Sequence, residues 1–140
     1  ESSAASDVYK RQSWSFAMTE KKRVMVLDDS KTIRTTTEGY LRELDYDVQC
    51  CTDGLNGISH MLDFNPDILL IDMEMPRMNG LQTVRLIRGN SRFKNTPIVM
   101  LSSKDGMFDM ALASDAGAND YIVKPPEKAA LQAVIKKHLG

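Results

Sequence analysis

The sequence has few cysteines, few aromatic residues, no long apolar run and almost no net charge. Its two cysteines, Cys50 and Cys51, are adjacent, and a disulfide between neighbours is strained, so two reduced thiols in a cytoplasmic protein are expected. No apolar run approaches the roughly 18 residues of a membrane-spanning helix, and the start lacks the pattern of a secretory signal. A formal net charge of -1 creates no overall field for nucleic acid or an anionic membrane. We expect neither as a partner.

The chain divides into a short tail and one domain. Residues 1–17 are rich in serine and lack periodicity, which predicts a disordered tail or an expression remnant. An interaction arm that uses Tyr9, Trp14 and Phe16 is the alternative. Residues 18–140 are long enough for one domain with a sizeable core.

Within this domain, strand patterns alternate with helix patterns. Short apolar runs bounded by polar residues predict buried parallel strands at 23–27, 47–51, 67–71, 97–101 and 120–123. Helices are expected from a cap at Asp29 or Ser30 to about 44, and at 55–64, 81–88, 108–116 and 127–139. Five such units joined by right-handed crossovers predict a three-layer α/β sandwich.

Two details of the helix at 55–64 are also predicted. Its apolar spacing places Leu55, Ile58 and Leu62 on the inward stripe. Gly57 is expected to loosen the helix by up to about 1 kcal/mol, because glycine has a poor helix propensity.

Reactive polar residues follow four of the apolar runs. Asp28 and Asp29 follow the first strand, Asp72 the third, Ser102 the fourth and Lys124 the fifth. The carboxyl ends of parallel strands meet at one edge of the sheet, where ligands bind. Three carboxylates, a hydroxyl and an ammonium at one edge suit a metal ion and a phosphoryl group. Taken alone, the pair Asp28-Asp29 is more typical of a helix cap.

Four ordered motifs resemble the receiver domain of response regulators. They are V-M-V-L-D-D-S, D-I-L-L-I-D-M-E-M-P-R-M-N-G, L-S-S and Y-I-V-K-P, and the similarity covers most of residues 22–140. The subtype it most resembles is the single-domain chemotaxis or twitching-motility kind. The resemblance implies a flavodoxin-like, five-stranded parallel sheet in the order 2-1-3-4-5, as in chemotaxis regulators.

The resemblance also implies a function and partners. Asp72 would accept a phosphoryl group from a sensor histidine kinase or phosphotransfer protein. The signal would pass to a downstream protein through the face formed by the fourth helix, fifth strand and fifth helix. The domain would catalyse only its own phosphorylation and dephosphorylation.

The metal implied by the resemblance is Mg²⁺, which prefers oxygen ligands. Asp29 and Asp72 would bind it directly, Asp28 would act largely through water, and the backbone carbonyl of Glu74 would complete the protein ligands. Such a cation would offset the repulsion between an anionic nucleophile and an anionic donor.

The remaining site residues implied by the family would contact the phosphoryl group or move in response to it. Lys124, aimed by a cis bond to Pro125, and the Ser102 hydroxyl would contact phosphoryl oxygens. Tyr121 matches the aromatic residue that turns inward when Ser102 moves.

Three positions depart from the usual pattern or tune it. Glu74 and Lys104 stand where the family adjusts the lifetime of the phosphate, and we hypothesise an ion pair between them across the mouth of the site. Two solvated surface charges are the simpler interpretation. Pro126 replaces a frequent phenylalanine and puts the packing at the start of the last helix in question.

Two other functions are compatible with the strand-end residues. A phosphohydrolase can also form an aspartyl phosphate, but those enzymes typically have an aspartate where Glu74 stands. A receiver-like scaffold that is never phosphorylated is the third possibility, which the complete set of polar residues disfavours.

Overall fold

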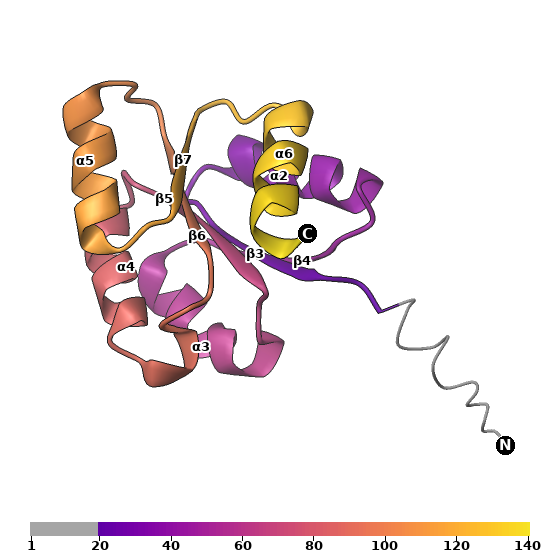
Figure 1. The fold of residues 1–140 in the computed structure, drawn as a ribbon, viewed down its shortest axis with the longest axis horizontal. Coiled ribbons are helices and arrows are strands. Elements are labelled where there is room, and N and C mark those ends of the chain that lie inside the picture. The colour runs from indigo at the N-terminus through magenta and orange to yellow at the C-terminus, as the bar shows by residue number, and fades with distance from the viewer. Residues whose placement is uncertain (1–19) are drawn as a thin grey trace, which may run out of the picture.

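A five-stranded parallel sheet lies at the centre of the structure, a computed structural model that describes residues 20–140 (Figure 1). The spatial order of its strands is β4-β3-β5-β6-β7, and every neighbouring pair is parallel. This is the predicted order 2-1-3-4-5. The strands are β3 (Arg23–Leu27), β4 (Asp47–Cys51), β5 (Ile68–Asp72), β6 (Ile98–Ser102) and β7 (Asp120–Val123). The expectations for the tail, residues 1–17, and for the first two residues of the expected domain fall outside the described part.

Helices cover both faces of the sheet, which confirms the three-layer sandwich. Figure 1 shows two helices on one face, α2 (Lys31–Glu43) and α6 (Lys128–Leu139). The other face carries α3 (Gly54–Phe64), α4 (Gly80–Arg88) and α5 (Met107–Ala116). A short 3₁₀ turn, η1 (Ser91–Phe93), follows α4 and was not predicted. None of the helices in the described part has the length and apolar character needed to cross a membrane.

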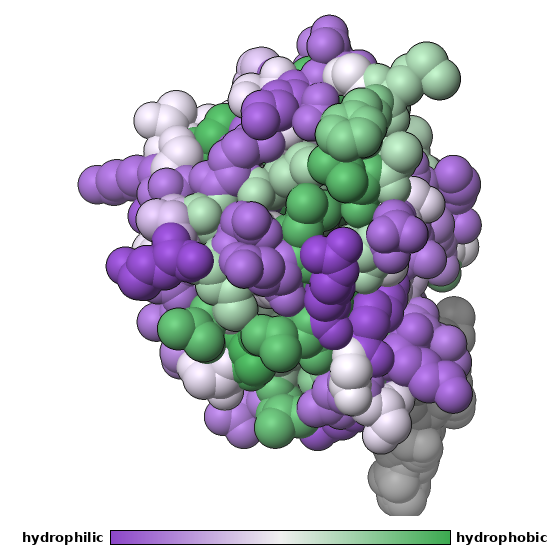
Figure 2. Space-filling model, turned by 90° about the vertical axis from the view of Figure 1, so that its left-hand side faces the viewer, coloured by the Kyte–Doolittle hydropathy of each residue, from purple (hydrophilic) through white to green (hydrophobic). Residues whose placement is uncertain are grey.

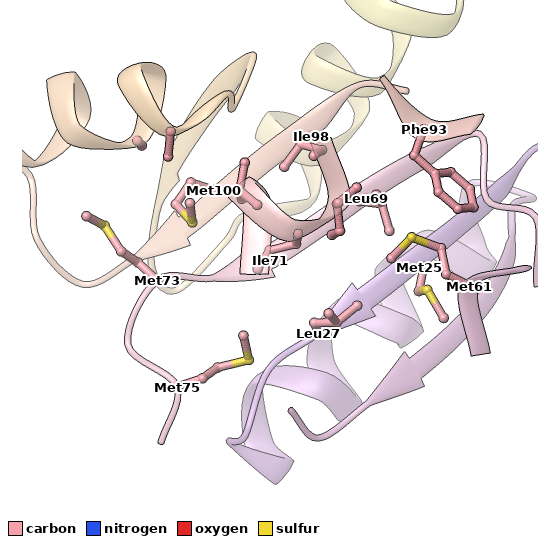
Figure 3. Close-up of a cluster of buried hydrophobic side chains, with 14 of the residues drawn as sticks. Met25, Leu27, Met61, Leu69, Ile71, Met73, Met75, Phe93, Ile98 and Met100 are labelled. Atoms are coloured by element: carbon pink, nitrogen blue, oxygen red, sulfur yellow. The ribbon is translucent and has the colours of Figure 1, made fainter. Parts of the chain in front are cut away.

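Two apolar clusters, one on each face, hold the layers together. Successive strand residues point to opposite faces, so Met25 and Leu27 pack toward α3 and α4 while Val24 and Val26 pack toward α2 and α6. Figure 3 shows the first cluster, in which methionines fill the space between the sheet and the helices. Met25 and Met100 are therefore core residues, as their strands predicted.

The starts of α2 and α4 follow from side-chain caps. Ser30, rather than Asp29, caps α2, because its hydroxyl accepts the backbone N–H of Ile33. Asn79 caps α4 and exchanges hydrogen bonds with Gln82 in a capping box. These caps fix where each helix leaves the edge of the sheet.

The predicted inward stripe of α3 is wrong at two of its three positions. The side chains of Leu55 and Leu62 are exposed, by 60% and 49%, and only Ile58 packs partly against the core. The buried face is formed by Gly54, Gly57 and Met61 instead. A Cβ atom on Gly57 would overlap the side chain of Leu27. The glycine thus allows the helix to approach the sheet closely, which apolar periodicity alone does not reveal.

The amino edge of the sheet holds a hydrogen-bonded cluster around Arg88. Its guanidinium donates to the carbonyl oxygens of Gly117 at 2.9 Å, Phe93 at 2.8 Å and Thr96 at 2.7 Å. It also donates to Asn119 Oδ1 at 2.7 Å. One side chain therefore joins the end of α4, the loop that leads to β6 and the segment before β7.

Candidate functional site

The predicted polar residues meet at the carboxyl edge of the sheet. Asp28 directly follows β3, and Asp72 is the last residue of β5. Asp28, Asp29 and Asp72 each offer a carboxylate oxygen, and these oxygens lie within 4.8 Å of one another. Asp28 and Asp72 are buried, whereas Asp29 is exposed. The burial of two of these carboxylates means that they repel each other with little screening by water.

Lys124 is the cation of this edge. Its ammonium lies 2.8 Å from Asp72 Oδ1 and 3.1 Å from Asp28 Oδ2. The peptide bond between Lys124 and Pro125 is cis, as the resemblance implied. One ammonium faces three carboxylates, so the site keeps an excess of negative charge.

Burial and the neighbouring charges shift the pKa values of the site. Burial, and then the charge of Asp72, raise the pKa of Asp28 above the ordinary value, although the Ser30 N–H and Lys124 oppose the shift. Burial also raises the pKa of Asp29, and the hydrogen bond and charge of Asp72 add to the effect. Burial lowers the pKa of Lys124, but its hydrogen bonds to Asp72 and Asp28 outweigh that and leave it raised. The two aspartates therefore bind a proton more readily than usual, and Lys124 keeps its proton more firmly.

The carboxylate of Asp72 has one engaged oxygen and one free oxygen. Oδ1 accepts from Lys124 Nζ and, at 3.0 Å, from the backbone N–H of Glu74. Oδ2 is buried, yet no group among residues 20–140 donates a hydrogen bond to it. A buried carboxylate oxygen without a donor fits a cation or an electrophile, because either would supply the missing partner.

The loop between β5 and α4 is folded back against Asp72. The N–H of Gly80 donates to the carbonyl of Met73 at 3.0 Å, which closes the loop. A Cβ atom on Gly80 would overlap the carbonyl oxygen of Asp72. The loop can therefore hold Glu74 beside the site only because position 80 is glycine.

A chain of hydrogen bonds starts at Glu74 and leads away from the carboxylates. The Ser102 hydroxyl donates to Glu74 Oε2 at 2.5 Å, and the backbone N–H of Ser103 points to Oε1 at 3.4 Å. The Ser102 oxygen accepts the backbone N–H of Lys104 at 3.0 Å. The Tyr121 hydroxyl donates to the Lys104 carbonyl at 2.7 Å. The site is thereby connected to β7.

Comparison with known proteins identifies the family. The model of the response regulator receiver domain matches residues 24–136. The chain belongs to this receiver domain family. Protein PilG of Pseudomonas aeruginosa is 46% identical over 117 residues, which are 84% of this chain and 87% of that protein.

Solved structures agree with this assignment. The Vibrio cholerae chemotaxis protein CheY4 superposes with a TM-score of 0.82 at 28% identity, covering 86% of this chain and 100% of that one. The receiver domain of the sensor histidine kinase PA1611 from Pseudomonas aeruginosa has a TM-score of 0.79 at 27% identity, covering 85% and 98%. That structure has a magnesium ion coordinated in its active-site cleft. The receiver domain described here is accordingly a phosphorylation-controlled switch of two-component signalling, and no finding favours a phosphohydrolase or a scaffold.

The hypothesised ion pair between Glu74 and Lys104 is absent from the described part of this receiver domain. The Glu74 carboxylate is turned toward Ser102, and Lys104 contacts the site through its backbone. Sequence reasoning missed the Glu74–Ser102 contact. The register of β5 against β6 pairs Asp72 with Leu101, but the direction of the Glu74 side chain has no signal in the sequence. Pro126, the other departure, is buried just before α6 begins.

Proposed function

We propose that Asp72 is the residue of this receiver domain that accepts a phosphoryl group, from a sensor histidine kinase or a phosphotransfer protein. The observation that carries this proposal is the free, buried Oδ2 of Asp72 beside two carboxylates and the Lys124 ammonium. In the transfer, an Asp72 oxygen forms a bond to phosphorus while the bond from phosphorus to the donor's histidine nitrogen breaks. The domain catalyses this step, and the later hydrolysis, only on itself.

Asp28, Asp29, Asp72 and the backbone carbonyl of Glu74 would hold Mg²⁺. The fit rests on the close carboxylate oxygens and the unpaired Asp72 Oδ2. When bound, the cation supplies positive charge against the repulsion between the donor phosphate and the aspartates. Asp28 also accepts the N–H of Ser30 at 2.8 Å, which fixes its carboxylate at the start of α2.

Lys124 and Ser102 would stabilise the phosphorylated state. The Lys124 ammonium already contacts Asp72 Oδ1 and can contact an oxygen of the attached phosphoryl group. The Ser102 hydroxyl is a donor on the neighbouring strand, and Tyr121 follows its movement through Lys104. Glu74 and Lys104 would set how long the phosphate lasts.

We assign the output to the face formed by α5, β7 and α6. Met107 and Phe108 of α5 are exposed by 86% and 75%, and Figure 2 shows apolar surface on the side of the molecule that carries this helix. Tyr121 lines grooves on both sides of β7, one toward α5 and one toward α6. A change at Tyr121 would therefore alter the surface that a downstream protein meets. The two free thiols suit a cytoplasmic location.

Incubation with Mg²⁺ and acetyl phosphate tests the proposal. Intact-mass analysis should show one added phosphoryl group, which should disappear when Mg²⁺ is chelated and in Asp72→Asn. The matched control is Asp63→Asn, which alters an exposed aspartate of α3 and should keep the adduct. An adduct that persists in Asp72→Asn would contradict the assignment, and steady turnover of phosphomonoesters would favour the hydrolase.

A further inference from the structure

We propose that Glu74 competes with the incoming phosphoryl group for the hydroxyl proton of Ser102, and that this competition limits how readily the site is occupied. The inference rests on the proposed function and adds to it a restraint on the resting site. Glu74 is then a positioning residue that acts on the reaction through Ser102.

The Ser102 hydroxyl has no spare donor in the structure. Its side chain is fully buried, it donates its only proton to Glu74 Oε2, and it accepts the Lys104 N–H. A hydroxyl donates one hydrogen bond at a time. Before Ser102 can donate to a phosphoryl oxygen, its bond to Glu74 must break.

Glu74 lies close enough to Asp72 for a phosphoryl group there to repel its carboxylate. Its backbone N–H donates to Asp72 Oδ1, while its carboxylate reaches over β6 to Ser102 and Ser103. The attached phosphoryl group carries about -1.5 to -2 charges where the Asp72 carboxylate carried one, and the added negative charge repels the Glu74 carboxylate. Because Glu74 is an exposed residue, its side chain can leave toward water.

The same contact extends to β7. Ser102 is held from one side by Glu74 and from the other by the Lys104 N–H, and the Lys104 carbonyl holds the Tyr121 hydroxyl. Release of Ser102 from Glu74 therefore changes the restraints on the segment that positions Tyr121. The carboxylate links occupancy of the site to the residue that lines the output grooves.

The test is the affinity of the intact chain for beryllofluoride, a non-covalent stand-in for the phosphoryl group, measured with Mg²⁺ by titration of backbone amide signals. Glu74→Ala should tighten binding roughly tenfold, since charge-assisted hydrogen bonds are strong. Glu74→Gln removes the charge and keeps an acceptor, so it should tighten binding less. The Ser103 amide signal should shift in Glu74→Ala without ligand, which shows that the contact existed.

A second background separates competition from simple repulsion. When Ser102→Ala is also present, Glu74 has no proton to hold, and Glu74→Ala should change the affinity by less than about threefold. The control Asp105→Asn removes a negative charge from the loop between β6 and α5 and should have a similarly small effect, because Asp105 makes no contact with Ser102 among the hydrogen bonds of the described residues.

Two results would overturn the inference. Equal tightening by Glu74→Ala with and without Ser102 would leave only charge repulsion, and unchanged or weaker binding would remove the competition altogether. In both cases wild-type binding of beryllofluoride still supports the proposed function. A wild-type chain that binds none in the presence of Mg²⁺ would instead refute the proposed function together with this inference.

Discussion

The two edges of the sheet handle charge in opposite ways. At the amino edge, the Arg88 guanidinium donates to three carbonyl oxygens and to Asn119 Oδ1. At the carboxyl edge, three carboxylates share one ammonium, and Asp72 Oδ2 has no donor within residues 20–140. One cluster is complete without a ligand, and the other is complete only with one.

The amino edge therefore contributes to stability, and the carboxyl edge to binding. A satisfied cluster joins segments and stabilises the fold, because its polar groups exchange water for protein partners. An unsatisfied cluster lowers stability and keeps that free energy available for binding a cation or a phosphoryl group. Substitutions at the two edges should therefore have effects of opposite sign on unfolding.

Removal of the Arg88 guanidinium should change the free energy of unfolding more than any other substitution proposed here. Arg88→Met should lower the free energy of unfolding by about 3 kcal/mol, because several oxygen acceptors lose their donor at once. Urea denaturation measures this change. The phosphoryl adduct per folded molecule should stay as in the wild type. Arg85→Met is the matched control on the same helix, since its ion pair with Asp115 is exposed and 3.9 Å long. A loss of less than 1 kcal/mol in Arg88→Met would mean that water replaces the guanidinium.

The close packing of α3 on the sheet, which carries both edges, depends on Gly57. Gly57→Ala should destabilise the protein by about 1–2 kcal/mol, because overlap with Leu27 outweighs the better helix propensity of alanine. Gly39→Ala is the control. No atom lies within 4 Å of a Cβ at this position of α2, so the change should stabilise by about 0.5–1 kcal/mol. Thermal or urea unfolding measures the change in stability of both variants. Stabilisation by both substitutions would show that Leu27 repacks freely.

Asp29→Asn should stabilise the metal-free protein. Two carboxylates about 5 Å apart repel by roughly 3 kcal/mol at an effective dielectric near 20, and the exposure of Asp29 and the nearby Lys124 reduce this to about 1 kcal/mol. Melting curves in EDTA measure the gain. With MgCl₂ the order should reverse, since the wild type gains a ligand and the variant has lost one. A variant that is no more stable than the wild type in EDTA would contradict the strained carboxyl edge.

The smallest expected effect is that the stabilisation by Asp29→Asn depends on pH. The raised pKa of Asp29 means that the folded state binds its proton more tightly than the unfolded state. The associated stability is present below the unfolded pKa and is lost as the pH rises through the folded pKa. The advantage of Asp29→Asn should therefore shrink by a few tenths of a kcal/mol between pH 7.5 and pH 5 in urea titrations with EDTA. An advantage that grows on acidification would show that the pKa of Asp29 is lowered instead.

The sequence alone predicted the strands and most of the site. Apolar runs located β3, β4 and β7 to the residue, and the polar residues at the strand ends do meet at one edge. The order of the strands came from the family resemblance, because no local pattern specifies which strands are neighbours. Strands β5 and β6 continue one residue further than predicted and include Asp72 and Ser102.

What the sequence did not predict depends on contacts between distant segments. The inward face of α3 is set by the close approach of Gly57 to Leu27, and a hydrophobicity pattern assigns no burial to glycine. Arg88 looks like a solvated end of a helix until its acceptors are placed around it. The choice of Glu74 between Lys104 and Ser102 is a matter of side-chain direction, which spacing does not encode.

The contact between Lys124 and Asp72 joins residues that are far apart in the sequence, which affects incomplete molecules. Its ammonium meets Asp72 across 52 positions of the chain, and β7, just before it, is the last strand of the sheet. During synthesis, Asp72 emerges long before its counter-ion, and non-local pairings form only after the intervening chain is available. A nascent, truncated or partly unfolded molecule therefore lacks the contact between Lys124 and Asp72, and we expect it to be a poor acceptor of the phosphoryl group. We therefore expect damaged copies to stay inactive rather than to give a false signal.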